Sequence, residues 1–265
     1  MSLPGLTRQS LVNITQIPVS LHGNNIITIP LSNIASFIAQ FSAVWYSYFM
    51  QNYIRARSDD QKEERLNQIK EAADSLFAQM PYTEITLTTI ADKLTWSRAN
   101  LYKYVTTKEE IFLEISAQKM ATYFNALNSA FPEGNKFSPE VTAEVWAGIL
   151  NANQDYLRYV SYLNPIIETN VTVDRLASFK KKYYDFAYTF RNKLSTMLAL
   201  SADEAYKLHL DVLMFAATTA VSCYKNPLIQ QALQKIGITP PKMDFYEDMR
   251  NFVLMRIKWS VRENG

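Results

Sequence analysis

A short stretch of the chain, residues 95–108, gathers side chains that suit contacts with nucleic acid. It contains three cations, Arg98, Lys103 and Lys108, and no acidic residue. Arginine can form paired hydrogen bonds with guanine, and asparagine, here Asn100, can do so with adenine. Lysine and tyrosine side chains hydrogen-bond to phosphate oxygens. The stretch therefore predicts a DNA-contacting surface, with an ordinary solvated helix face as the alternative.

Two short helices are predicted to position these side chains. The first follows the N-cap Thr86 and ends near Leu94, and the second follows the N-cap Ser97. Serine and threonine are favoured there because their side-chain oxygens accept hydrogen bonds from the free N–H groups of the first turn. The connection is so short that the helices must cross steeply, as in a helix-turn-helix. Leu101 and Val105, four residues apart, are expected to face inward and leave the rest of the second helix exposed.

The residues expected to contact DNA lie on that exposed face and at the starts of the neighbouring helices. An α-helix has the right dimensions to enter a major groove. Asn100 is expected to reach a base edge, Arg98 a base or a phosphate, and the tyrosines and lysines phosphates or base methyl groups. The full set is Thr86, Thr88, Ser97, Arg98, Ala99, Asn100, Tyr102, Lys103, Tyr104 and Lys108.

The composition of the whole chain favours a helical protein without a catalytic centre. The chain has 265 residues, six glycines and a formal net charge of +2. Asn-Gly, a common hairpin turn, occurs once, at residues 264–265, and Asp-Gly does not occur. The chain has no glycine-rich phosphate loop, G-x-S-x-G or H-E-x-x-H motif. The lone Cys223 and the histidines His22 and His209 offer little for a metal site or a triad. No catalytic residue, metal site or cofactor is predicted.

Residues 1–49 are predicted to be an extension that differs from the rest of the chain. Residues 33–54 are uncharged and mostly apolar and are followed by Arg55 and Arg57. This run is long enough to cross a bilayer, although polar side chains interrupt it. Three interpretations stay open: a loosely structured stretch upstream of a start at Met50, a helix packed on the protein, or a membrane anchor.

Two domains are predicted to follow, and the predicted fold class is all-α. Residues 50–124 form an N-terminal three-helix helix-turn-helix domain, whose first helix runs from a capping box at Ser58 to Pro81 and leads to a further helix from Thr107. Residues 125–265 form a C-terminal helical domain for effector binding and dimerisation. Its helices are expected to start or stop at Ser138, Asn164-Pro165, Val173, Leu198, Ser201, Pro227, Gly237 and Asp244.

The C-terminal domain contains two very apolar helices and a cluster of aromatic residues. Residues 212–223 carry no charge, so this helix must be covered on all sides. Together with the last helix, it is expected to form a four-helix interface between two protomers, unless both helices are internal core. An aromatic cavity suits a small hydrophobic or aromatic effector. The residues expected to line it are Trp146, Tyr156, Tyr159, Tyr183 and Tyr184.

The stretch "LTTIADKLTWSRANLYKYVTTKEEIF" resembles the DNA-binding domain of the tetracycline-repressor (TetR) family of bacterial transcriptional regulators. The resemblance covers about residues 62–112. It implies a homodimeric repressor with an all-α ligand-binding C-terminal domain and a dimer interface in the two C-terminal helices. It also implies that Tyr102 contacts the phosphate backbone and that Lys108 opens the next helix beside it. The matching positions are Ala73, Phe77, Thr86, Ile90-Ala91, Ser97, Leu101-Tyr102 and Lys108-Glu109.

Three positions depart from the family pattern. Thr95 stands where the family usually has a glycine in the turn, Trp96 where it has a small aliphatic residue, and Val105 where it has a phenylalanine. A β-branched residue is poorly suited to positive φ, so the turn is expected to be distorted or of another type. Trp96 is expected to be a core residue that supplies the volume missing at Val105.

The expected function is a cytoplasmic, ligand-responsive transcriptional regulator. It would bind double-stranded operator DNA as a homodimer and be released by a small hydrophobic or aromatic effector. A membrane-tethered DNA-binding sensor, anchored by residues 33–54, is the alternative. An enzyme in a helical bundle is the third reading, which the missing catalytic constellation disfavours.

Overall fold

The structure, a computed structural model, describes residues 16–20, 26–30, 60–223 and 227–262. The chain divides into two compact units, residues 1–64 and 65–265. The predicted apolar run at residues 33–54 lies outside the described residues. Within the described part, no helix is both long and apolar enough to cross a membrane.

The first unit contains a two-stranded hairpin that the sequence reasoning did not predict. Strands β1 (Gln16–Ser20) and β2 (Ile26–Pro30) pair antiparallel, with Gln16 opposite Pro30 and Ser20 opposite Ile26. β1 contains Ile17 and Val19, and β2 contains three isoleucines and Thr28, which are residue types that fit a pleated surface. The described remainder of the chain is helical.

The predicted helix-turn-helix is present, and local capping explains its boundaries. A helix at residues 60–79 ends before Pro81. A short 3₁₀ turn, η1 (Tyr82–Glu84), leads to three further helices, α2 (Leu87–Lys93), α3 (Arg98–Leu101) and α4 (Lys108–Ala130). The predicted N-caps are confirmed, since Thr86, Ser97 and Thr107 each accept a hydrogen bond from the backbone N–H three residues on.

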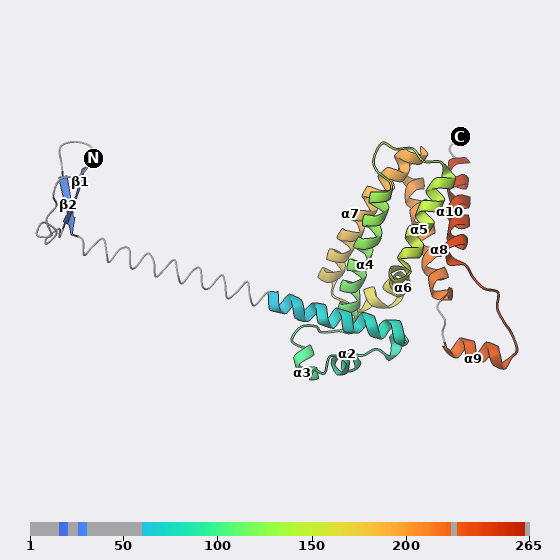
Figure 1. The fold of residues 1–265 in the computed structure, drawn as a ribbon, viewed down its shortest axis with the longest axis horizontal. Coiled ribbons are helices and arrows are strands. Elements are labelled where there is room, and N and C mark those ends of the chain that lie inside the picture. Colours follow the sequence, from blue (N-terminus) through green and yellow to red (C-terminus); the bar gives the residue numbers. More distant parts are fainter. Residues whose placement is uncertain (1–15, 21–25, 31–59, 224–226, 263–265) are drawn as a thin grey trace, which may run out of the picture. The chain divides into compact units, whose positions relative to one another are not determined.

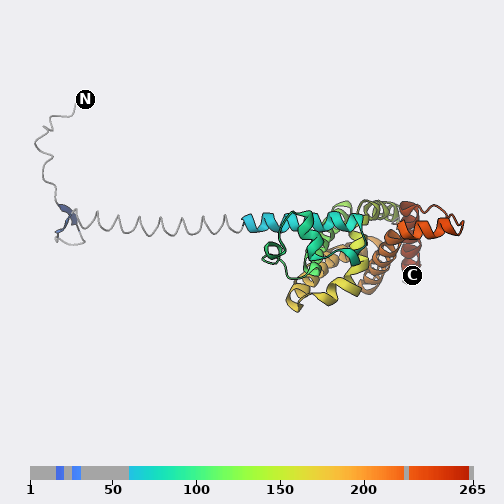
Figure 2. The same ribbon diagram turned by 90° about the horizontal axis from the view of Figure 1, so that it is seen from below.

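The C-terminal part is a bundle of longer helices (Figure 1). Helix α10 packs on α5 and α8, α6 on α8, and α7 on α4 and α8. In the view from below, the helical residues 65–79 cross the end of this bundle (Figure 2). The elements are α5 (Pro139–Ala152), α6 (Gln154–Tyr162), the π-helical turn η2 (Leu163–Ile167), η3 (Glu168–Asn170), α7 (Val173–Leu198), α8 (Ala202–Cys223), α9 (Pro227–Lys235) and α10 (Phe245–Arg262).

Helix α4 joins the helix-turn-helix to the bundle without a break. The predicted boundary between residues 124 and 125 falls inside this helix, and residues 65–265 form one compact unit. One face of α4 is buried along almost its whole length, from Ile111 to Leu127. A rigid helix therefore connects the start of the DNA-reading part to the middle of the C-terminal core.

Candidate nucleic-acid interface

The turn between α2 and α3 keeps a glycine-like backbone although it contains a threonine. Thr95 has φ 57°, in the left-handed region. Its N–H donates to the Asp92 carbonyl at 3.0 Å, and the Trp96 N–H donates to the Ala91 carbonyl at 2.9 Å. These are the two hydrogen bonds of a Schellman cap, whose left-handed position is usually glycine. The prediction of a distorted turn is wrong, because the hydrogen bonds of the turn are regular. Thr95 adopts the left-handed backbone conformation that the turn requires, which is unfavourable for a threonine.

Helix α3 is shorter than predicted and is followed by a tighter turn. Its α-helical part ends at Leu101, and residues 102–104 form a turn. The N–H groups of Lys103 and Tyr104 donate to carbonyls three residues back, at 3.3 and 3.0 Å. Such i→i+3 bonds wind the chain more tightly than an α-helix does. Leu101 and Val105 are buried, as predicted.

The exposed face of α3 and its turn contains several of the side chains predicted to contact DNA. Arg98, Ala99 and Lys103 are exposed, and Tyr102 is 58% exposed. Asn100 is partly buried. This face therefore presents two cations, a phenol and an amide within two turns, the groups that contact bases and phosphates.

Three of the remaining predicted contact residues, Thr86, Ser97 and Tyr104, contact other parts of the protein. The Thr86 and Ser97 hydroxyl oxygens each accept a hydrogen bond from a backbone N–H, at 3.1 and 3.2 Å. Thr88, in the first turn of α2, is partly buried. Tyr104 is half-buried against Trp96, with ring centroids 5.9 Å apart. These side chains are thus fixed in place at the edge of the exposed face.

Arg65 adds a cation beside the turn that the sequence reasoning missed. Its guanidinium carbon lies 5.2 Å from the centre of the Trp96 ring, within the range of a cation–π contact. Trp96 is half-buried and packs at the edge of the core, rather than within it as predicted. Thirty-one positions separate Arg65 from Trp96 in sequence, so no spacing rule could have paired them.

Lys108, which the sequence predicts to contact a phosphate, has protein partners in the structure. Its Nζ donates to the carbonyls of Tyr82 and Ile85, at 3.0 and 2.7 Å, and lies 4.1 Å from the centre of the Tyr82 ring. The Tyr82 hydroxyl in turn donates to Glu109 Oε1 at 2.9 Å. Partial burial lowers the pKa of Lys108. The amine thus anchors the start of α4 to the turn that precedes α2.

The five residues predicted to contact an effector differ in how deeply they are buried. Trp146, Tyr156 and Tyr159 are buried core residues, whereas Tyr183 is half-buried and Tyr184 is mostly exposed. The Trp146 Nε1–H donates to the Tyr123 hydroxyl at 3.1 Å, and the Tyr159 hydroxyl donates to Asp74 at 2.7 Å.

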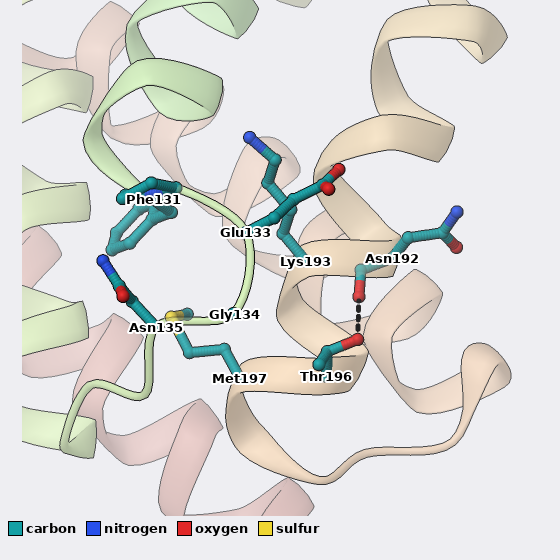
Figure 3. Close-up of a pocket in the computed structure, with 9 residues that line it drawn as sticks. Phe131, Glu133, Gly134, Asn135, Asn192, Lys193, Thr196 and Met197 are labelled. Atoms are coloured by element: carbon teal, nitrogen blue, oxygen red, sulfur yellow. Dashed lines mark hydrogen bonds between the residues drawn. The ribbon is translucent and has the colours of Figure 1, made fainter.

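Two of the surface hollows in the described part lie beside α7, and none of these five residues lines either of them. One, of about 250 Å³, lies between the loop at residues 131–135 and Asn192, Lys193, Thr196 and Met197 of α7 (Figure 3). The other, of about 220 Å³, lies between α4 and α7 beside Arg175. Their positions in the sequence identify these residues as aromatic, but the packing of the helices decides how deeply each one is buried.

A buried imidazole lies among the aromatic side chains of the bundle. His209 is fully buried, with the rings of Phe124, Trp146 and Phe190 within 6.5 Å of it, centroid to centroid. Arg191 Nε donates to its Nδ1 at 3.2 Å, so the neutral ring carries its proton on Nε2. Burial, followed by the charge of Arg191, lowers the pKa of His209 to about 3. Its Nε2–H has no hydrogen-bond partner among the described residues.

Comparison with known proteins matches both parts of the chain. A family model described as "Bacterial regulatory proteins, tetR family" matches residues 69–115, and one described as "Tetracyclin repressor-like, C-terminal domain" matches residues 117–258. A search of curated proteins found no match.

Similar solved structures include regulators from several bacteria. The TetR-family regulator PfmR from Thermus thermophilus is 17% identical, with 72% of this chain and 97% of that chain covered and a TM-score of 0.48. The fatty acid degradation regulator FadR from Bacillus halodurans is 16% identical, with 73% and 94% covered and a TM-score of 0.46. AmtR from Mycobacterium smegmatis is 16% identical, with 71% and 84% covered and a TM-score of 0.46. Since one family model alone spans more than half of the sequence, the chain belongs to the TetR family of bacterial transcriptional regulators.

Proposed function

We propose that this TetR-family regulator is a homodimeric repressor that reads its operator with α3 and is released by a small hydrophobic or aromatic effector. The observation that carries the proposal is the exposed face of α3 and its turn. Arg98, Tyr102 and Lys103 are exposed and Asn100 is partly buried, whereas Leu101 of the same segment is buried in the core. A helix presented in this way has the shape and the donors to enter a major groove.

Dimerisation is supported by an apolar surface shared by α8 and α10. Each helix buries one face and leaves apolar side chains on the other, with Phe215 39% and Trp259 59% exposed. Phe215 stacks on Phe252 with ring centroids 3.8 Å apart. Met214 and Met255 are exposed on the same two helices. Contiguous exposed apolar side chains of this kind favour an isologous contact with a second copy of the chain.

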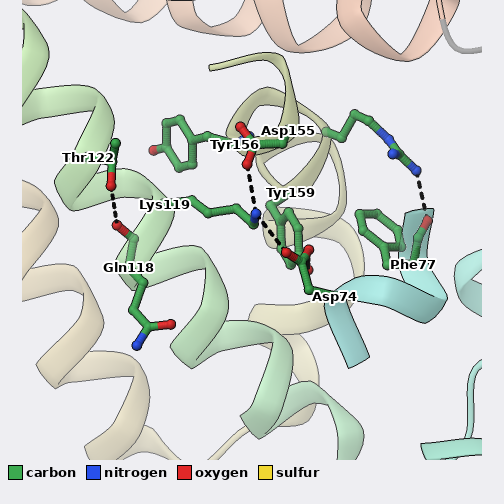
Figure 4. Close-up of polar contacts among 9 residues, drawn as sticks. Asp74, Phe77, Gln118, Lys119, Thr122, Asp155, Tyr156 and Tyr159 are labelled. Atoms are coloured by element: carbon green, nitrogen blue, oxygen red, sulfur yellow. Dashed lines mark hydrogen bonds and ion pairs between the residues drawn. The ribbon is translucent and has the colours of Figure 1, made fainter. Parts of the chain in front are cut away.

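A polar network supports communication between the bundle and the DNA-reading part. Lys119 of α4 lies between Asp74 of the helix at residues 60–79 and Asp155 of α6, at 2.8 and 2.7 Å (Figure 4). Burial opposes the charge of Lys119, but hydrogen bonds to Asp155 and Asp74 outweigh it and raise the pKa of Lys119. Tyr159 adds a hydrogen bond to Asp74. A shift of α4 or α6 on effector binding would therefore move the helix that supports α2 and α3.

The side chains around His209 suggest which chemical groups an effector would carry. The rings around His209 favour an apolar or aromatic body, and the unpartnered Nε2–H favours a hydrogen-bond acceptor such as a carbonyl or carboxylate. Trp146 and Tyr156, in the same core, are retained as proposed contacts. Tyr184 is dropped because its side chain points largely to solvent.

Selection of bound fragments from random DNA tests the proposal directly. We expect enrichment of one sequence with two-fold symmetry, and failure to enrich any sequence would contradict DNA reading by α3. On the selected operator, Asn100→Ala should cost about 1–3 kcal/mol at one base position. Lys103→Ala should weaken all sequences alike and lower the salt slope by about one unit. Lys136→Ala, an exposed lysine in the loop before α5, is the matched control and should change neither quantity.

A further inference from the structure

Arg191 on α7 is a partly buried cation whose contacts in the bundle are aromatic rings. Its Nε–H donates to the Nδ1 atom of His209 at 3.2 Å. Its guanidinium carbon lies 4.2 Å from the centre of the Tyr206 ring, within the range of a cation–π contact. Neither partner is a carboxylate, so neither contact neutralises the guanidinium.

Other arginines of the same compact unit pair with acidic side chains. The Nε atom of Arg175 lies 3.2 Å from a Glu110 oxygen, and the Nη2 atom of Arg256 lies 2.6 Å from an Asp211 oxygen. Within the part of the chain that the structure describes, no carboxylate lies at ion-pair distance from Arg191. Because an unpaired charge is unfavourable where water is partly excluded, Arg191 favours an anion that comes from outside the chain.

Two ionisable rings beside the guanidinium do not supply the missing negative charge. Burial raises the pKa of Tyr183, and the charge of Arg191 only opposes this shift. The Tyr183 hydroxyl therefore keeps its proton at neutral pH. His209 is uncharged as well, since burial, followed by the charge of Arg191, lowers its pKa to about 3. The positive charge of Arg191 is thus not compensated by these neighbours.

Arg191 connects the surface of the bundle with the ring cluster around His209. Tyr206, under the guanidinium, is 40% exposed, whereas His209 and Phe190 are fully buried, with ring centroids 5.6 Å apart. A ligand that binds Arg191 could keep its charged group near solvent and place an apolar body among the rings. Sites for small molecules commonly combine apolar walls with a single charged residue in this way.

We propose that the effector is a small acid with an apolar or aromatic body, whose carboxylate binds the guanidinium of Arg191. This inference rests on the effector-responsive regulator proposed above and names the chemical class of its ligand. The parallel N–H groups of a guanidinium match the two oxygens of a carboxylate. Because Nε–H is already bound to His209, the N–H groups of the two Nη atoms would bind the carboxylate.

Matched acids and amides test the charge of the effector. Benzoate, phenylacetate and 3-phenylpropionate are titrated into the complex of the full chain with its selected operator, beside benzamide, phenylacetamide and 3-phenylpropanamide. Each acid and its amide have nearly the same shape and differ in charge. We expect at least one acid to release the operator, with its amide at least about tenfold weaker. Equal release by acid and amide, or release by none of the six compounds, overturns the inference.

Variants of Arg191 test whether this guanidinium binds the acid. Arg191→Met should weaken binding of the active acid at least about tenfold and leave binding of its amide unchanged, a difference that a general loss of structure would not produce. Arg191→Lys keeps the charge without the fork and should lie between the two. Lys181→Met removes an exposed cation from the same helix and should change neither value. Equal binding of the acid by Arg191→Met and the wild type would overturn the assignment.

The proposed function and this inference fail in different ways. Operator binding is measured first without any ligand, and its absence would contradict the regulator itself. A protein that binds its operator and is released by amides as readily as by acids would remain an effector-responsive regulator. That outcome would refute only the anionic class of the effector and the role of Arg191.

Discussion

Replacing Thr95 with glycine should stabilise the protein, although the substitution removes a side chain. A residue with a Cβ pays roughly 1–2 kcal/mol to adopt the left-handed conformation, and Thr95 adopts it at φ 57°. Glycine loses about 0.5–1 kcal/mol more backbone entropy on folding than alanine does. The hydrogen bond from the Thr95 hydroxyl to the Leu94 carbonyl is exposed and contributes little. The net gain is about 0.5–1 kcal/mol, or about 2 °C in Tm for a protein of this size.

Urea and thermal unfolding of three variants measure this gain. Thr95→Ala removes the β-branch but keeps the Cβ, so its stability should lie between those of the wild type and Thr95→Gly. Thr106→Gly makes the same chemical change at an exposed residue that does not have a positive φ. This variant should therefore be less stable than the wild type. If Thr95→Gly were no more stable than the wild type, the turn would not be strained. The Schellman geometry would then not be the conformation of this chain in solution.

Three further predictions concern residues whose roles the structure defines. Lys108→Met should lower the free energy of unfolding by about 1–2 kcal/mol in urea titrations, because two backbone carbonyls lose a charged donor. The salt dependence of DNA binding should not change. A salt slope reduced by about one unit would show instead that Lys108 contacts a phosphate. The pKa of His209 is about 3 in the folded protein, against an ordinary value of 6.5. Between these two values only the unfolded state binds the proton. The free energy of unfolding is therefore highest above pH 6.5 and should be about 2 kcal/mol lower at pH 5. The same urea titrations at pH 7.5 and 5.0 should show this loss in the wild type and not in His209→Gln, and an equal loss in both would assign it to other groups. Phe215→Arg should produce folded monomers by light scattering, because it places an unpaired charge in the proposed α8–α10 interface; a folded dimer would show that the interface lies elsewhere.

Helix starts and the helix-turn-helix were predictable because their signals are local. Thr86, Ser97 and Thr107 cap their own helices through hydrogen bonds that span three residues, and Ser201 with Glu204 does the same at α8. Such bonds depend on neighbouring positions and scarcely on the rest of the fold. The apolar spacing of four between Leu101 and Val105 also sufficed to predict which side of the recognition segment is buried.

The direction of long side chains was not predictable, because their partners come from other helices. The place of Lys108 in a cationic stretch predicts a phosphate contact, but its amine donates to two carbonyls on the turn before α2. Arg65 lies over Trp96 although thirty-one positions separate them. The burial of the aromatic residues predicted to contact an effector also depends on packing between helices. Trp146 is fully buried, whereas Tyr184 is mostly exposed.

By itself, the sequence determined the family, the order of the helices, their caps and the inward or outward register of α3, because capping and amphipathic periodicity act over one or two turns. Only the tertiary structure determines how the helices pack on one another. It gave Lys119 its place between Asp74 and Asp155, and it buried one face of α8 while leaving Phe215 exposed. It also held Thr95 in a conformation that threonine disfavours by itself. The physical reason is that contacts between distant segments form only when whole helices pack, and packing can impose on one residue a conformation or a partner that its neighbours do not encode.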